Sequence, residues 1–166
     1  MLKLNLLVMF LMFTITNGNC QTKIDDDRIK IHKSVIDILK KERGKFRVHP
    51  FTKKTSFSSF DFASGGRGLD TNANRAWNNK EWISFVHSID TSSISDYPLH
   101  INTPDKEERK ELVFAPIIFS KDGTKALAIA KLYFYESQTG SGMAWFFERD
   151  NNVWKVKDMQ LFAIIN

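Results

Sequence analysis

The sequence predicts an α+β domain: an N-terminal helix and a second mid-chain helix packed on a curved antiparallel sheet that ends in a four-strand meander. Two stretches, residues 28–43 and 77–89, space their apolar side chains at helical intervals. Residues 112–166 instead contain apolar runs joined by short polar turns. Helices followed by consecutive strands are typical of α+β domains, and 166 residues are enough for one hydrophobic core.

The strands of the meander are bounded by residues that favour turns. The Asp-Gly pair at residues 122–123 predicts a tight hairpin, because both residues tolerate positive φ. Residues 137–142 supply two glycines for a looser turn, and the Asp-Asn-Asn run at 150–152 predicts another hairpin. The strands are expected at residues 112–120, 125–136, 143–149 and 153–165.

The run at 125–136 predicts a central strand, because its alternate residues are mostly apolar on both faces. One face carries a row of three alanines between residues 126 and 130, which leaves room for a helix to lie close. The helix at 28–43 is the expected cover of that face. The opposite face needs a second cover, which could be the helix at 77–89, a bound ligand or a partner.

Helix ends and apolar stripes can also be placed. Three aspartates at 25–27 are expected to begin the first helix, since acidic side chains favour the positive end of the helix dipole, and Gly44 is expected to end it. Asn78 or Asn79 is the expected N-cap of the second helix. The buried stripes are expected to be Ile31, Val35, Ile38 and Leu39 in the first helix, and Trp82, Phe85, Val86 and Ile89 in the second.

A bulge is expected in the last strand, near Lys157 and Asp158. Unbroken alternation from Trp154 would turn Asp158 toward the core. One extra residue in the strand would instead turn Met159 and Leu161 inward, so the bulge is the favoured interpretation.

The first 20 residues (1–20) are predicted to be a secretory signal peptide, which leaves residues 21–166 as a single domain. The segment has an apolar run that is too short to span a membrane, so the chain is not expected to be an integral membrane protein. Cleavage between Cys20 and Gln21 would give an exported protein, periplasmic or extracellular. The alternative is a lipoprotein anchored through Cys20. Asn19 argues against it, because a small residue is expected before a lipidated cysteine.

No motif for catalysis or for metal or cofactor binding stands out. The four histidines share no ligand spacing, and the single cysteine lies in the predicted signal peptide. The sequence therefore predicts no metal site and no cofactor. Its serines and carboxylates lack the context of known catalytic motifs, which favours a non-enzymatic protein without deciding the question.

Basic residues concentrate between positions 40 and 54, in a chain of formal net charge +5. With aromatic residues among them, they could bind an anionic polymer such as nucleic acid or glycan, or a membrane surface. The alternative is an ordinary solvated surface. The members of this basic patch are Lys40, Lys41, Arg43, Lys45, Arg47, Lys53 and Lys54.

Tyr133, Tyr135 and Trp145 form a second candidate site. On adjacent antiparallel strands their rings could make a flat patch that stacks on sugars or bases. The alternative is that they are packed aromatic residues of the sheet, because aromatic side chains favour strands in any case.

Residues 116–127, Tyr133, residues 140–142 and residues 152–156 together carry a recognisable pattern. They resemble small exported bacterial proteins of unknown function in which a "Pro-Ile-Phe-Ser" strand, a Gly-x-Gly turn and a "Trp-Lys-Ile" strand form a C-terminal meander behind a signal peptide. The resemblance implies export and a sheet but no activity. Many of those proteins have cysteines around the glycine turn, whereas residues 136–142 have none here. A helix-covered curved sheet is also similar, in architecture alone, to the NTF2-like cone.

These observations favour an exported binding or accessory module that uses its sheet face or its loops. Two alternatives stay open: a small hydrolase acting on nucleic acid or envelope polymer, and an immunity-type protein that binds a toxin. An apolar cavity without titratable groups would favour binding. The hydrolase would gain if two or more of these residues met in one pocket: His49, His87, His100, Glu81 and Asp90.

Overall fold

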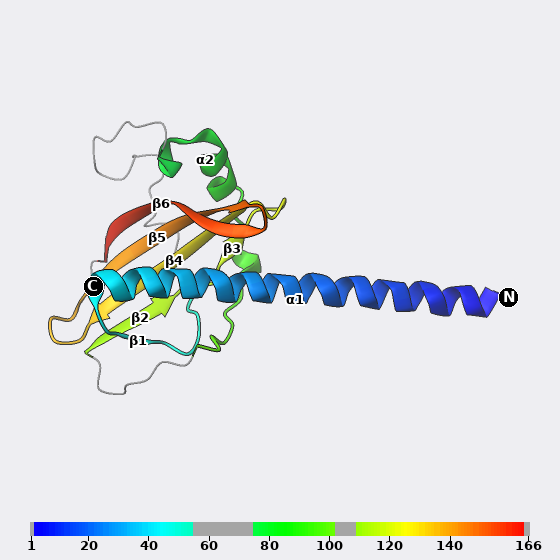
Figure 1. Ribbon diagram of the computed structural model, residues 1–166, viewed down its shortest axis with the longest axis horizontal. Helices are drawn as coiled ribbons and strands as arrows, with labels where there is room; N and C mark the ends of the chain where they lie inside the picture. The colour runs from blue at the N-terminus through cyan, green and yellow to red at the C-terminus, as the bar shows by residue number, and fades with distance from the viewer. Residues whose placement is uncertain (1, 55–74, 102–108, 165–166) are drawn as a thin grey trace.

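The computed structural model describes residues 2–54, 75–101 and 109–164, which form two α-helices and a six-stranded sheet (Figure 1). The predicted α+β class is confirmed. The helices are α1 (Leu2–Arg43) and α2 (Lys80–His87), and the 3₁₀ turns are Ala76–Asn78 and Thr91–Ser93. The strands are β1 (Arg47–Val48), β2 (Lys110–Phe114), β3 (Ile118–Phe119), β4 (Lys125–Phe134), β5 (Thr139–Asp150) and β6 (Val153–Ile164).

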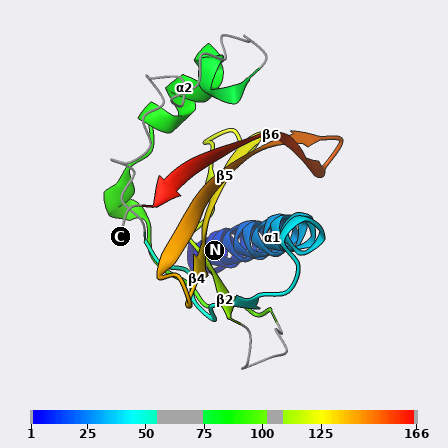
Figure 2. The ribbon, with the colours of Figure 1, turned by 90° about the vertical axis from the view of Figure 1, so that its left-hand side faces the viewer.

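The strands lie in the order β1-β2-β4-β5-β6, with β3 beside β4. Strands β4, β5 and β6 follow one another as an antiparallel meander, β2 is antiparallel to β4, and β1 joins β2 in parallel. The sheet curves around α1, which lies in its hollow, and α2 lies on the outer side (Figure 2). The curved sheet with two helices and a C-terminal meander agrees with the prediction.

The predicted strand at 112–120 is divided into β2 and β3. Both halves pair with β4, but the chain between them has one more residue than the facing part of β4. Pro116 lies in this interruption and has no N–H group for the ladder of hydrogen bonds. The proline therefore explains why one predicted strand becomes two.

The turn before β5 is shorter than predicted. Strand β5 begins inside the expected loop, so Gly140 and Gly142 belong to the strand and pair with Tyr133 and Lys131. As a result, β5 places no side chain beside Tyr133 and Lys131. The other predicted turns keep their residues, and positive φ angles occur at Gly123, Asn151 and Asn152.

Strand β4 is buried on both faces, as predicted for the central strand. On the hollow side, its alanines at 126–130 pack with Ile31, Val35 and Leu39 of α1 in one hydrophobic cluster, here called the α1-side core. The opposite face packs on α2 in a second cluster, called the α2-side core. Its buried members are Ala76, Trp82, Phe85, Ala115, Leu127, Ile129, Ala144 and Phe146.

Helix α1 begins at Leu2, so the prediction that it starts at the aspartates of residues 25–27 is wrong. The helical hydrogen-bond pattern continues through these acids, and Asp27 is buried against the sheet, where it forms an ion pair with Arg149. A buried ion pair of this kind offsets the poor fit of an aspartate within a helix. The helix ends as predicted at Gly44, whose N–H bonds to the Lys40 carbonyl at 3.1 Å.

The buried stripe of α1 is close to the prediction. Ile31, Val35 and Leu39 are buried as expected, whereas Ile38 is half-buried and Ile36 takes its place in the core. The buried stripe is therefore rotated slightly toward Ile36. The curved sheet contacts a broad part of the helix surface, so this small rotation still buries the apolar side chains.

The bulge in β6 is confirmed. Phe146 pairs with Asp158 and Phe147 with Val156, so Lys157 is the extra residue. After the bulge, Met159 packs against the α1-side core as predicted, but Leu161 is 54% exposed. The bulge turns Leu161 toward the hollow side, but the surrounding residues do not bury its side chain there.

Helix α2 is short but well anchored. The Asn79 side chain accepts hydrogen bonds from the N–H groups of Glu81 and Trp82, which confirms Asn79 as the N-cap. The Trp82 ring meets Phe146 edge-on, with ring centroids 5.1 Å apart, and its Nε1 donates to Glu148 at 3.1 Å. Because α2 has only eight residues, its contacts in the α2-side core reach no further along β4 than Ile129. Within the described residues, the helices include none that is both long enough and apolar enough to cross a membrane.

Candidate functional site

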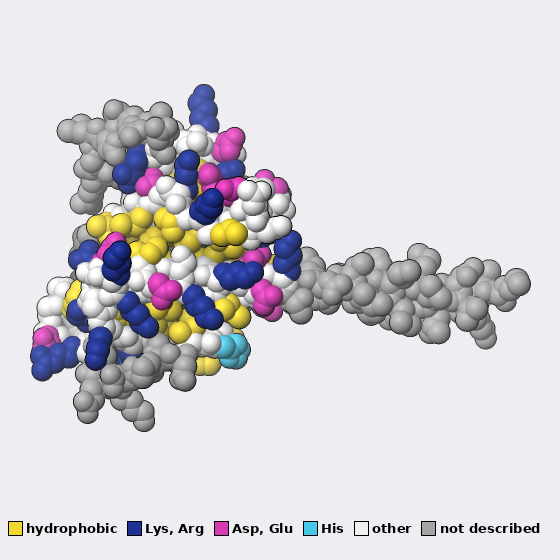
Figure 3. Space-filling view, in the orientation of Figure 1, with side chains coloured by type: hydrophobic (Ala, Val, Ile, Leu, Met, Phe, Trp, Pro, Cys, Tyr) yellow, Lys and Arg dark blue, Asp and Glu magenta, His cyan; other side chains and the backbone are white. Residues whose placement is uncertain are grey.

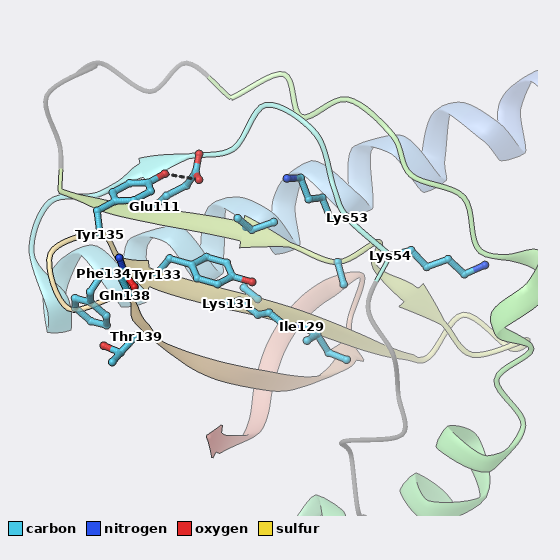
Figure 4. A pocket seen from close by; sticks show the side chains of 13 residues that line it. Lys53, Lys54, Glu111, Ile129, Lys131, Tyr133, Phe134, Tyr135, Gln138 and Thr139 are labelled. Carbon is cyan, nitrogen blue, oxygen red and sulfur yellow. Dashed lines mark hydrogen bonds between the residues drawn. The ribbon is translucent and has the colours of Figure 1, made fainter. Parts of the chain in front are cut away.

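A cavity of about 460 Å³ adjoins the α2-side core on the outer face of the sheet (Figure 4). Ala115 and Ile129 belong both to that core and to the cavity lining, so the cavity begins where the cover by α2 ends. The lining residues come from β2 and the residue after it, β4, the β4–β5 turn, the first residue of β5 and the segment after β1. They are Lys53, Lys54, Glu111, Val113, Ala115, Ile129, Ala130, Lys131, Tyr133, Phe134, Tyr135, Gln138 and Thr139.

Alternating residues of two paired strands make the floor of the cavity. Glu111 faces Tyr133 and Val113 faces Lys131 in the antiparallel register of β2 and β4. Ile129 continues the same face toward α2. The floor is therefore apolar at the α2 end and polar at the end near the β4–β5 turn.

The segment after β1 makes one wall. The His49 N–H bonds to the Leu112 carbonyl at 2.8 Å, and the Lys53 N–H bonds to the Phe114 carbonyl at 2.7 Å. These bonds extend the pairing of β1 with β2 and hold Lys53 and Lys54 beside the floor. In Figure 4 the two lysine side chains extend in opposite directions from this segment.

The cavity has an excess of positive charge. Lys53, Lys54 and Lys131 form no ion pair with any carboxylate of the described residues. Glu111, the one acid among the described lining residues, is already paired with Arg47 at 3.1 Å. The electrostatic potential inside the cavity therefore favours an anion.

A polar network closes the end of the cavity near the β4–β5 turn. The Tyr135 hydroxyl donates to Glu111 Oε2 at 2.6 Å and accepts a hydrogen bond from Arg47. The Arg47 guanidinium also lies over the Tyr135 ring, 5.1 Å from its centroid. Burial and the hydrogen bond to Glu111 raise the pKa of the Tyr135 hydroxyl above its usual value, so the phenol stays protonated and continues to donate at neutral pH.

The three aromatic residues predicted as one patch are separated. Tyr133 and Tyr135 line the cavity, but Trp145 pairs with Ala128 and lies in the α1-side core, 1% exposed. Ala128 and Tyr133 stand at positions of opposite parity in β4, so their side chains point to opposite faces. The stacking surface is therefore limited to the two tyrosines.

The predicted basic patch is also divided. Lys53 and Lys54 line the cavity, and Arg47 contacts Tyr135 at its edge. Basic side chains on the α1 side are interspersed with acidic ones and do not gather into one patch (Figure 3). Exposed residues at the C-terminal end of α1 and in the following turn, outside the cavity lining, are Lys40, Lys41, Arg43 and Lys45.

Two charged residues of the cavity lining, Lys131 and Glu111, were not among the predicted site residues. Lys131 is the only charged residue between Ala126 and Phe134, and a charge on one face of an otherwise apolar central strand is the signal that could have identified it. Glu111 had no such signal, because it follows a run of charged residues typical of a surface turn.

The titratable residues that would support a hydrolase do not meet in this cavity. His49, His87, Glu81 and Asp90 are outside its lining, and His100 lines a second cavity of about 350 Å³ together with His32 and Tyr97. Among the described residues, no group of three or more histidine, cysteine or acidic side chains is placed to hold a metal ion.

The chain matches no family model, and the searches of curated proteins and of solved structures give no match.

Proposed function

We propose that this protein is an exported, non-enzymatic binding module whose ligand site is the cavity at the end of the outer sheet face that α2 does not cover. The observation that carries the proposal is the contrast along β4. The same face packs on α2 up to Ile129 and lines a cavity from Ile129 to Tyr135.

The cavity is not the purely apolar one that was expected for binding, because lysines, tyrosines and Glu111 line it, but its mixed composition supports a ligand site. Ligand sites are concave, largely apolar and fitted with a few polar groups that fix orientation, and their volumes fall in the range of several hundred Å³. Here Val113, Ala115 and Ile129 supply the apolar surface. Tyr133 and Lys131 supply polar groups on the same strand face, and the paired strands hold them in fixed register.

A ligand screen by thermal shift tests this function, because any ligand that binds the native state raises the melting temperature by mass action. The chain purified with its native N-terminal processing would be screened against nucleotides, glycans, lipids and small organic acids. Tyr133→Ala should abolish the shift produced by a true ligand, since Tyr133 lines the cavity. Leu161→Ala is the matched control, because Leu161 is an exposed strand residue outside the cavity lining. A ligand that stabilises both variants as well as wild type would contradict the proposed site.

Export is the second part of the proposal. It is supported by the N-terminal sequence pattern and by the resemblance to exported proteins with a similar meander. Mass spectrometry of the mature N-terminus tests it. A chain beginning at Gln21 is expected, an acylated Cys20 would indicate a lipoprotein instead, and a chain that retains Met1 would contradict export by cleavage.

A further inference from the structure

We propose that the ligand of the cavity is a small amphipathic anion, with its apolar body on Val113 and Ile129 and its anionic oxygens at the ammonium groups of Lys131 and Lys53. This inference rests on the proposed binding function and specifies the ligand class. A carboxylate and a phosphate ester share the required chemistry, which is an anionic oxygen head group joined to an apolar body.

Lys131 is the first argument. It lies on the central strand β4, half-buried, between Val113 of β2 and Gly142 of β5. A half-buried lysine packs its aliphatic stem on the sheet and keeps its ammonium in contact with solvent, here in the cavity that Lys131 lines. Lys131 forms no ion pair with a carboxylate of the described residues. Its ammonium is therefore available to an anionic ligand in the cavity.

The second argument is that the negative charge of Glu111 is already neutralised by neighbouring residues. Glu111 would repel an anion, but Arg47 and the Tyr135 hydroxyl both bind its carboxylate. Lys54 extends in the opposite direction from Lys53, away from the end of the cavity where Tyr133 and Tyr135 lie (Figure 4). Lys131 and Lys53 are therefore the principal cationic groups.

The order of residues along the floor is the third argument. Ile129 and Val113 lie toward α2, Lys131 is next, and Tyr133 follows toward the β4–β5 turn. An apolar body on Ile129 and Val113 would carry its head group to Lys131. The volume of about 460 Å³ accommodates a molecule with one or two rings, whereas an extended polymer would need a continuous groove.

A matched series of naphthalene compounds tests the ligand class. Naphthoate, naphthyl phosphate, naphthalenemethanol and naphthylmethylamine share one apolar body and differ in head group. Titrations followed by amide chemical shifts give both the dissociation constant and the location of binding. The anions should bind about tenfold more tightly than the alcohol, as expected for one charge-assisted hydrogen bond, and the amine should bind most weakly. The ratio between naphthoate and naphthyl phosphate identifies the preferred head group.

Lys131→Met keeps the aliphatic part of the side chain and removes the charge, so it should abolish the preference for anions while the alcohol still binds. Lys53→Met should reduce the same preference, and it provides a second test if Lys131→Met is unstable. Lys121→Met is the control, because it makes the same change in net charge in the turn before β4, outside the cavity lining.

The outcomes distinguish this inference from the proposed function. Equal binding of alcohol and anions in the cavity would overturn the ligand class and leave the binding site intact. Chemical-shift changes located outside the cavity would overturn the site itself. So would a failure of all four compounds to bind, if the thermal screen also finds no stabilising ligand. An anion preference that survives in both lysine variants would also contradict the inference.

Discussion

The two faces of the sheet are covered in different ways. In the hollow, α1 packs with buried residues of β2, β4 and β5, and this α1-side core holds most of the large buried side chains, including Phe114, Trp145 and Phe147. On the outer face, the two-turn helix α2 covers one end, and the other end forms the cavity. One sheet therefore has a closed face and a partly covered face, and the candidate site lies on the partly covered one.

The difference originates in the residues of β4 and β5. On the hollow side, small alanines from β4 lie beside large residues from β5, so α1 packs closely on a filled surface. On the outer side, β5 places Phe146 and Ala144 under α2 but two glycines beside Lys131 and Tyr133. At those two positions β5 contributes no side chain to the outer face, and the cavity is lined there by residues of β4 and β2.

Removing one large aromatic side chain from each face should give the largest contrast. Trp145→Ala empties a fully buried position of the α1-side core and should lower the free energy of unfolding by about 3–5 kcal/mol. Tyr133→Ala removes a half-buried ring from the cavity floor and should cost about 1 kcal/mol. Equilibrium urea titration measures both values. Equal losses would show that the cavity face contributes as much stability as the hollow.

The buried ion pair between Asp27 and Arg149 attaches α1 to the end of β5. Their side chains are 9% and 17% exposed, and the Arg149 guanidinium also stacks over the Trp154 ring at 4.4 Å. Asp27→Ala would leave a partly buried cation without its carboxylate and should lower the free energy of unfolding by about 2–4 kcal/mol.

The double variant Asp27→Leu with Arg149→Met provides the comparison for this pair. It removes both charges and keeps apolar volume, so it should lose less stability than Asp27→Ala alone. A double-mutant cycle in urea gives the coupling energy. A double variant as unstable as the single one would show that packing of Arg149 on Trp154, and not the ion pair, holds α1 at this end.

The closed face should also make the protein sensitive to acid through His32. Burial, with a smaller effect of the nearby Arg28 charge, lowers the pKa of His32 from 6.5 to about 3. The unfolded chain therefore binds a proton at this residue between pH 6.5 and pH 3 while the folded chain does not, so stability falls as the pH falls through this window. At pH 4.5 the loss should be about 2–3 kcal/mol relative to pH 7.5.

Urea titrations at the two pH values measure this effect. His32→Gln removes the titrating group and should reduce the difference between pH 7.5 and pH 4.5, although it lowers stability at both. His49→Gln, at a less buried histidine beside β1, should leave the difference as large as in wild type. The assignment to His32 would be rejected if its variant kept the full acid sensitivity.

Local patterns explain why so much of the fold could be predicted. The alternation in β4, the turn residues at 150–152 and the bulge at Lys157 depend on near neighbours in the chain, so each leaves a mark in the sequence. The start of α1 was mispredicted for the same reason. The aspartates at 25–27 have the composition of a helix start, but the ion pair that buries Asp27 depends on Arg149, far along the chain.

The candidate site could be predicted only in part. Tyr133 and Tyr135 were found because they share one strand face, and Lys53 and Lys54 because they belong to a run of basic residues. That these two groups meet depends on the parallel pairing of β1 with β2, which periodicity does not reveal. Trp145 was misplaced because its face depends on the register between β4 and β5, and a shorter turn changed the expected start of β5.

The smallest contrast between the two faces should come from two tyrosine hydroxyls, one on each side of the sheet. On the hollow side, the Tyr97 hydroxyl accepts a hydrogen bond from the Ile117 N–H at 3.0 Å and contacts His32 Nε2 at 3.0 Å. Tyr97→Phe leaves both groups without this partner in a buried setting and should cost about 1–3 kcal/mol.

Tyr135→Phe makes the same chemical change at the edge of the cavity. Tyr135 is 46% exposed, and Glu111 and Arg47 would still pair with each other, so the cost should stay below about 1 kcal/mol. Urea titration of the two variants under one set of conditions measures the difference. If Tyr135→Phe proved as costly as Tyr97→Phe, the network around Glu111 would be a structural element of the sheet, and the cavity would be less free to adapt to a ligand than its exposure implies.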